Sequence, residues 1–311
     1  MPHLADTTVA AGASRQWDAV MSPGRTSVVA SLEEAVARIP DGATVGIGGA
    51  VTAGHPMTLV RALARRGVRG LTLVGPVAGI EVDLLVAAGC VARVIGSYVG
   101  VESAGAVGPV FRRAVQDGTV EVVDLDEAHC VAGLRAAGQG LPFLPWRGGV
   151  GTAYTELNPS LKQFDDPIRG EPLLAIPALE LDYALIYSEV ADAVGNAQPV
   201  GTAHMDALLG AAADHVIVQA DRVVSTDEIR RAPEQTLYWR DTTVVRAPFG
   251  THPYSNGWMT ADERHLRAFV KAGRAGGEDL DAYMSTYVTG AADHDAYLEA
   301  VGIRRIASLL I

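Results

Sequence analysis

A glycine-rich turn at residues 41–56 holds the residue types most suited to chemistry. The sequence there is Asp-Gly-Ala-Thr-Val-Gly-Ile-Gly-Gly-Ala-Val-Thr-Ala-Gly-His-Pro. Glycines at the end of a strand let the backbone approach a ligand closely, because no Cβ is in the way. The helix that follows offers free N–H groups to an anion or a developing oxyanion. The pattern predicts a binding site at Gly48, Gly49 and Gly54, and a tight turn without a ligand is the alternative.

Polar side chains in or near such turns are candidates for the same site. Thr52 and His55 lie within the glycine-rich turn, and Ser97 and Tyr98 follow a second predicted strand. Hydroxyl groups can bind a substrate carboxylate, and an imidazole can contact an acyl group or a phosphate. Glu102, directly beyond that second turn, is the best candidate carboxylate. Each of the five also has a plain structural interpretation, as a turn, core or solvated surface residue.

The elements that must position these residues alternate along the chain. Strands are predicted at residues 44–47, 71–74, 91–95, 120–123, 173–176, 184–187 and 216–219, with helical patterns between most of them. This order predicts an α/β fold with a mostly parallel sheet and helices on both faces. Ligands in such sheets bind beyond the carboxyl ends of the strands, where both turns lie. Residues 138–172 are predicted to form most of a long loop, functional or covered by another subunit.

The glycine-rich turn resembles the N-terminal signature of the α subunits of family I coenzyme A transferases. The matching positions are Asp41, Gly42, Val45, Ile47, Gly48, Gly49, Gly54 and Pro56, whereas Gly46 and Ala50 depart from the signature. Further segments are similar to the glutaconate-type branch of that family: residues 96–100, 126–127, 133–137, 141–145, 192–196 and 247–253. The steroid ring-opening hydrolases, which act on CoA thioesters, share these segments.

The resemblance implies a CoA-transferase (NagB/RpiA-like) fold over residues 31–311, after a flexible leader at residues 1–30. It implies transfer of CoA from an acyl-CoA to a carboxylic acid through a glutamyl-CoA intermediate, which is nucleophilic catalysis. The nucleophilic glutamate of the family lies in a Ser-Glu-Asn-Gly motif of the β subunit, and this chain has no such motif. We therefore expect a β-subunit partner and an inactive isolated chain. The CoA thioester is a substrate, and no cofactor is expected.

The resemblance also suggests roles for two further side chains. His252 falls within the glutaconate-type segment and is expected to reach the substrate site. In the ring-opening hydrolases a carboxylate in the region of Glu102 would act as general base. Arg147, in the predicted long loop, is a candidate partner for a carboxylate or phosphate, or a surface residue.

Composition excludes several classes of function. The net charge of −11 argues against nucleic acid as the main partner, and no apolar segment has the length of a membrane span. The two cysteines, Cys90 and Cys130, form no disulfide framework and favour a reducing cytoplasm. The histidines and cysteines lack metal-ligand spacing, so no metal site is expected. Neither a P-loop nor a dinucleotide fingerprint is present.

Three functions from different classes remain besides the transferase. The first is a ring-opening CoA-thioester hydrolase that uses Glu102. The second is a structural subunit that only holds a catalytic partner, and the third is an unrelated dinucleotide-binding domain. Product analysis separates the first from a transferase, because a hydrolase consumes water and opens a carbon–carbon bond.

Overall fold

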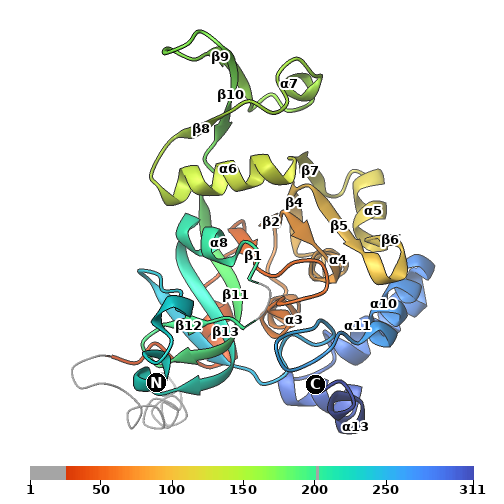
Figure 1. The fold of residues 1–311 in the computed structure, drawn as a ribbon. Coiled ribbons are helices and arrows are strands. Elements are labelled where there is room, and N and C mark those ends of the chain that lie inside the picture. Colours follow the sequence, from red (N-terminus) through yellow and green to blue (C-terminus); the bar gives the residue numbers. More distant parts are fainter. Residues whose placement is uncertain (1–25, 201–202) are drawn as a thin grey trace, which may run out of the picture.

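A mostly parallel sheet forms the centre of the computed structural model, which describes residues 26–200 and 203–311 (Figure 1). Its strand order is β14-β13-β11-β1-β2-β4-β7, with β12 antiparallel beside β11. The strands are β1 (Thr44–Ile47), β2 (Leu71–Val74), β4 (Val91–Gly96), β7 (Glu121–Asp124), β11 (Leu181–Asp192), β12 (Ala197–Gln198), β13 (Ala213–Val224) and β14 (Thr242–Arg246). The predicted α/β fold is confirmed.

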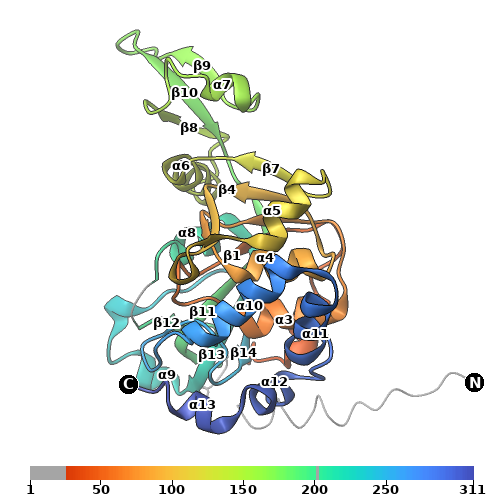
Figure 2. The ribbon, with the colours of Figure 1, turned by 90° about the vertical axis from the view of Figure 1, so that its right-hand side faces the viewer.

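Two groups of helices cover the two faces of this sheet (Figure 2). One face carries α2 (Leu32–Ala37), α3 (Met57–Arg66), α4 (Ile80–Ala87), α5 (Pro109–Gln116), α10 (Glu263–Ala275) and α11 (Gly277–Tyr287). The other carries α6 (Glu127–Gly138) and α8 (Asp206–Ala212). Because side chains alternate along a strand, Leu185 packs into the first core while Ala184 and Ile186 pack into the second.

The N-terminal residues that the structure describes join the edge of the sheet. Val29 forms a parallel bridge with Val244 of β14, and the N–H of Ala30 donates to the carbonyl of Val244 at 2.9 Å. The capping box predicted at Ser31 and Glu34 is present at the start of α2. Residues 1–25 of the predicted leader lie outside the described residues.

An arm projects from the body between α6 and β11 (Figures 1 and 2). It consists of the antiparallel strands β8 (Phe143–Trp146), β9 (Lys162–Asp165) and β10 (Pro172–Pro177), together with the short helix α7 (Tyr154–Leu157). The prediction of a long loop over residues 138–172 misses these short elements, although most of the segment lies between them. Short strands interrupted by Gly and Pro show little periodicity in the sequence, but they become regular once β10 pairs with both neighbours. Arg147 lies on this arm and forms an ion pair with Glu171.

A second small sheet follows β4 and carries the candidate carboxylate. Strand β5 (Tyr98–Val101) pairs with β3 (Val77–Ala78) and with β6 (Ala106–Val107), and a single 3₁₀ turn, η1 (Glu102–Ala104), joins β5 to β6. The chain ends in α12 (His294–Val301) and α13 (Ile303–Ala307). Among the described residues, no helix combines the length and the apolar character needed to cross a membrane.

Candidate active site

The glycine-rich turn leaves the carboxyl end of β1 and folds back on itself. A bridge joins Ala50 to Ala53, and Gly49 and Gly54 have φ angles of 92° and 72°. A Cβ at Gly49 would lie 2.8 Å from the backbone of Gly54 and from both the backbone nitrogen and the ring of His55. Only glycine fits there without moving backbone. Val51 also adopts a positive φ of 55°, which a β-branched residue rarely does.

A buried carboxylate lies against this turn from the other layer of the fold. Asp206, the first residue of α8, accepts a hydrogen bond from the N–H of Gly49 at 3.2 Å. A Cβ at Gly48 would lie 2.0 Å from Oδ1 of Asp206, so the carboxylate packs directly on the glycine pair. Burial raises the pKa of Asp206 to about 6, although the N–H of Gly49 and the charge of His55 oppose the rise.

A histidine, a glutamate and a tyrosine form a buried cluster behind the turn. Nδ1 of His55 lies 3.3 Å from Oε1 of Glu81, and the His55 ring lies 4.2 Å from the ring of Tyr254. The His–Glu contact has ion-pair distance but lacks the alignment of a hydrogen bond, so both ring nitrogens have no hydrogen-bond partner in the described structure. Burial opposes ionisation of Glu81, yet His55 and the N–H of Gly79 bring its pKa below the usual value.

A second segment, residues 254–257, covers the turn. The backbone N–H and the hydroxyl of Ser255 both donate to the carbonyl of Thr52 at 2.8 Å, and the N–H of Gly54 donates to the carbonyl of Ser255 at 3.0 Å. The hydroxyl of Tyr254 accepts from the N–H of Ile80 at 2.6 Å. These bonds tie the turn to a stretch of chain about 200 positions away.

A small cavity of about 90 Å³ opens between the turn and the end of β11. Gly54 lines one side and Glu189 lines the other. Oε1 of Glu189 accepts from the N–H of Gly257 at 2.9 Å, and Oε2 accepts from the N–H of Val200 at 2.5 Å. Burial raises the pKa of this carboxyl. Sequence reasoning missed Glu189, which lies among other polar residues at the end of β11, Ser188 and Asp192, and therefore gives no local signal.

The second predicted turn lies at the same edge of the sheet. Strand β2 separates β1 from β4, so the ends of these strands are about 10 Å apart. Ser97 donates its hydroxyl to the carbonyl of Pro76 at 2.5 Å, and Tyr98 is half-buried. Glu102 is exposed in η1, which packs against α10. Gly48, Gly49, Thr52, Gly54 and His55 therefore share one loop, while Ser97, Tyr98 and Glu102 lie further along the edge.

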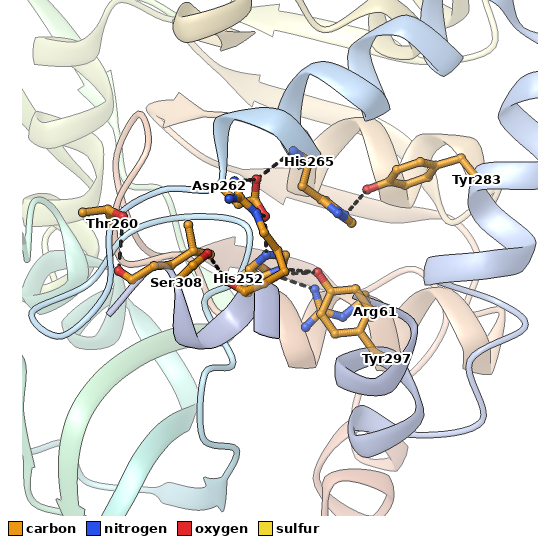
Figure 3. Close-up of polar contacts among 10 residues, drawn as sticks. Arg61, His252, Thr260, Asp262, His265, Tyr283, Tyr297 and Ser308 are labelled. Atoms are coloured by element: carbon orange, nitrogen blue, oxygen red, sulfur yellow. Dashed lines mark hydrogen bonds and ion pairs between the residues drawn. The ribbon is translucent and has the colours of Figure 1, made fainter. Parts of the chain in front are cut away.

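His252 belongs to an internal network beneath the C-terminal helices (Figure 3). Its Nδ1 lies 2.6 Å from the hydroxyl of Tyr297, and its Nε2 lies 3.2 Å from Oδ2 of Asp262. Arg305 also binds Asp262, at 2.6 and 2.8 Å. The side chain is fully buried. Protein groups thus occupy both ring nitrogens of His252, which lies two positions before Tyr254 of the buried cluster.

The described part of the chain contains no group of three or more histidine, cysteine or acidic side chains arranged to hold a metal ion. The hydrogen-bond donors around the glycine-rich turn are instead backbone N–H groups, with buried carboxylates beside them. Such an arrangement can bind an oxyanion once the N–H groups are free.

Comparisons with known proteins agree on one family. The sequence profile described as coenzyme A transferase matches residues 29–244. The IpdA subunit of the cholesterol ring-cleaving hydrolase of Rhodococcus jostii is 34% identical over 275 residues, which is 85% of this chain and 92% of that subunit. A protein of Archaeoglobus fulgidus is 36% identical over 90% of this chain, but this chain spans only 65% of its length.

A solved structure is similar over almost the whole chain. Glutaconate coenzyme A-transferase from Acidaminococcus fermentans superposes with a TM-score of 0.86 at 29% identity, covering 92% of this chain and 96% of that one. The two proteins therefore share the mostly parallel sheet with its two helical layers.

Proposed function

Because this chain belongs to the coenzyme A transferase family, we propose that it is the α subunit of a heteromeric enzyme that moves CoA between an acyl-CoA and a carboxylic acid. The glycine turn of β1 carries the proposal. The turn lies at the carboxyl edge of the sheet, where it can receive a thioester carbonyl once its N–H groups are released from their protein acceptors. The extensive structural similarity to glutaconate coenzyme A-transferase supports the same chemistry.

The attacking carboxylate is assigned to a partner β subunit. The chain has no Ser-Glu-Asn-Gly motif, and the relatives from the ring-cleaving hydrolase and from glutaconate CoA-transferase are each one subunit of their enzyme. In this proposal a glutamate of the partner attacks the thioester carbonyl, and the thiolate of CoA leaves as an anhydride forms. N–H groups of the glycine turn stabilise the tetrahedral oxyanion in between. Both cysteines are free and buried, which suits a reducing cytoplasm.

Reconstitution tests this assignment. The chain is purified alone and with the product of a neighbouring reading frame that contains Ser-Glu-Asn-Gly. We expect CoA exchange between an acyl-CoA and a free acid only in the mixture. Exchange at ordinary enzyme rates by the chain alone contradicts the proposal. Catalysis that survives damage to the glycine turn supports a subunit that only holds its partner.

A ring-opening CoA-thioester hydrolase is the second candidate function. The observation that favours it is the 34% identity to the cholesterol ring-cleaving hydrolase subunit. In this case Glu102, exposed at the same sheet edge, is the general base that activates water. Glu102→Gln in the assembled complex should then reduce turnover at least tenfold. Glu278→Gln, an exposed carboxylate of α11, is the matched control. Unchanged kinetics of Glu102→Gln would contradict the hydrolase and leave the transferase as the proposed function.

A further inference from the structure

A larger cavity adjoins the small one beside the glycine turn. It has a volume of about 480 Å³ and lies at the carboxyl ends of β13 and β14, where Ala220 and Arg246 are paired in register. Asn256 lines both cavities, so the larger one begins where the smaller one, beside Gly54, ends. The chemistry proposed for the glycine-rich turn assigns no role to this larger cavity.

Two guanidinium groups line the larger cavity. Arg246 is exposed, and among residues 26–200 and 203–311 no carboxylate lies within 4.0 Å of it. Arg222 has only a loose contact with Glu228, 3.6 Å between nitrogen and oxygen, and its side chain is 53% exposed. Arginine is well suited to planar two-oxygen anions, which it binds through two parallel N–H donors. The two side chains therefore offer a carboxylate or phosphate site in a chain whose net charge is −11.

Two aromatic side chains, Phe249 and Trp258, line the cavity together with Asp221, Pro248 and Asn256. Trp258 is 41% exposed, and its ring centre lies 5.8 Å from the guanidinium carbon of Arg222. Phe249 has a φ of 58°, which non-glycine residues rarely adopt and which is found mainly at functional sites. Oδ2 of Asp221 accepts from the hydroxyl of Tyr187 at 2.6 Å and from the amide of Asn256 at 3.2 Å, while its buried Oδ1 has no hydrogen-bond partner in the described structure. An apolar wall with a few placed charges is typical of small-molecule sites.

We propose that this cavity binds the acyl part of the thioester, and that Arg222 and Arg246 bind a carboxylate at the far end of that acyl group. The inference rests on the proposed function, because it places the thioester carbonyl at the glycine turn. The ligand class is an apolar acyl group with a terminal carboxylate. Its carbon skeleton lies against Trp258 and Phe249, and its carboxylate takes the donors that no protein group occupies at Arg246.

Binding measurements on the full-length chain test the proposal without requiring turnover. The probes are glutaryl-CoA and suberyl-CoA, compared with valeryl-CoA and octanoyl-CoA, which lack the second carboxylate. Arg222→Gln and Arg246→Gln should each weaken binding of the carboxylated esters about tenfold, because each removes a charge-assisted hydrogen bond. Binding of the other two esters should change less than twofold. Arg112→Gln, an exposed arginine of α5, is the control.

The phosphates of CoA are the competing source of the anion. In that case the arginine variants weaken all four esters and free CoA equally, and the acyl assignment is wrong. It is also wrong if the wild-type chain binds none of the probes. Quenching of fluorescence by glutaryl-CoA that is lost in Trp258→Phe supports the site independently. If the chain binds carboxylated esters through these arginines but exchanges CoA with no partner, this inference holds and the proposed function is wrong.

Discussion

The backbone N–H of Gly49 donates to Oδ1 of Asp206 at 3.2 Å, across 157 positions of sequence. One donor of the proposed oxyanion site is therefore already engaged by a carboxylate of the same chain. An oxyanion and an ionised Asp206 would compete for this N–H, and they would repel each other. The charge state of Asp206 thus affects how strongly the N–H of Gly49 is held. The neighbours of Asp206 are His55 in the turn and His204, which contacts Glu127 of α6.

Replacing Asp206 by Asn should stabilise the protein above pH 6. Burial raises the pKa of Asp206 from 3.8 to about 6, so the fold favours the neutral acid. The stability that the neutral acid contributes is lost as pH rises from about 4 through 6, and the loss approaches about 3 kcal/mol. Asn keeps the acceptor for Gly49 without the charge. Urea denaturation at pH 4 and pH 7.5 should show the variant gaining only at the higher pH.

A matched variant controls for this result. Asp182 accepts a hydrogen bond from the N–H of Thr44 at 2.7 Å. Thr44 is at the start of β1, the strand that leads to Gly49, and Asp182 is exposed whereas Asp206 is buried. Asp182→Asn should not gain stability at pH 7.5. Equal behaviour of the two variants contradicts a special role for the buried carboxylate.

Gly49→Ala should disrupt the site far more than a glycine substitution in open space. The added Cβ would lie 2.8 Å from backbone atoms of Gly54 and His55, so the turn must move in addition to the cost of a positive φ. Gly42→Ala is the control, because Gly42 has a φ of 79° with no atom within 4 Å of the added Cβ. We expect the control to lose about 1 kcal/mol of stability and keep activity in the complex. Gly49→Ala should lose at least tenfold in turnover.

The sequence predicts the parts of this site that depend on local pattern. The strand at residues 44–47, the turn at Gly49 and the helix after Pro56 all follow from glycine placement and apolar spacing. Asp206 and Tyr254 were not predicted, because they contact the turn across more than 50 positions. Glu189 was not predicted because its partners, Val200 and Gly257, lie in other loops. No local signal marks such partners. The arm was missed for a related reason, since its strands are regular only when paired.

Acid should loosen the C-terminal helices before it unfolds the sheet. Burial lowers the pKa of His265 to about 3 and that of His294 to about 4, and the nearby cation of Arg61 adds to the effect at both. Both histidines are thus neutral in the fold, and the stability that depends on them is present above pH 6.5. It is lost as pH falls toward 4, by about 3 kcal/mol for His294 alone.

Hydrogen exchange measured by mass spectrometry at pH 7 and pH 5 tests this order of events. Once rates are corrected for intrinsic pH dependence, residues 262–311 should lose protection at pH 5 while β1 and β11 keep theirs. His204→Asn, which alters a half-exposed contact with Glu127, should leave the difference unchanged. Uniform loss of protection across the chain contradicts the prediction.

Arg61 should tolerate Met better than Lys, although Lys is the conservative substitution. Arg61 is 2% exposed, its guanidinium lies 3.5 Å from the ring centre of Tyr297, and it donates to the carbonyl of His252 at 2.9 Å (Figure 3). Among the described residues no carboxylate pairs with it. Lys keeps the cost of a buried charge but loses the planar stacking, whereas Met fills the space without a charge.

The carbonyl of His252 loses a donor in the Met variant. The hydroxyl of Tyr297 lies 3.3 Å from this carbonyl, but it has one proton and can donate there only by giving up its bond to Nδ1 of His252 at 2.6 Å. We expect Arg61→Lys to be less stable than Arg61→Met by about 1 kcal/mol or more, on the order of the desolvation cost of an unpaired buried charge. Urea denaturation at pH 7 measures the difference. The reverse order would mean that the positive charge itself stabilises this network, through the ionised Asp262 beyond His252.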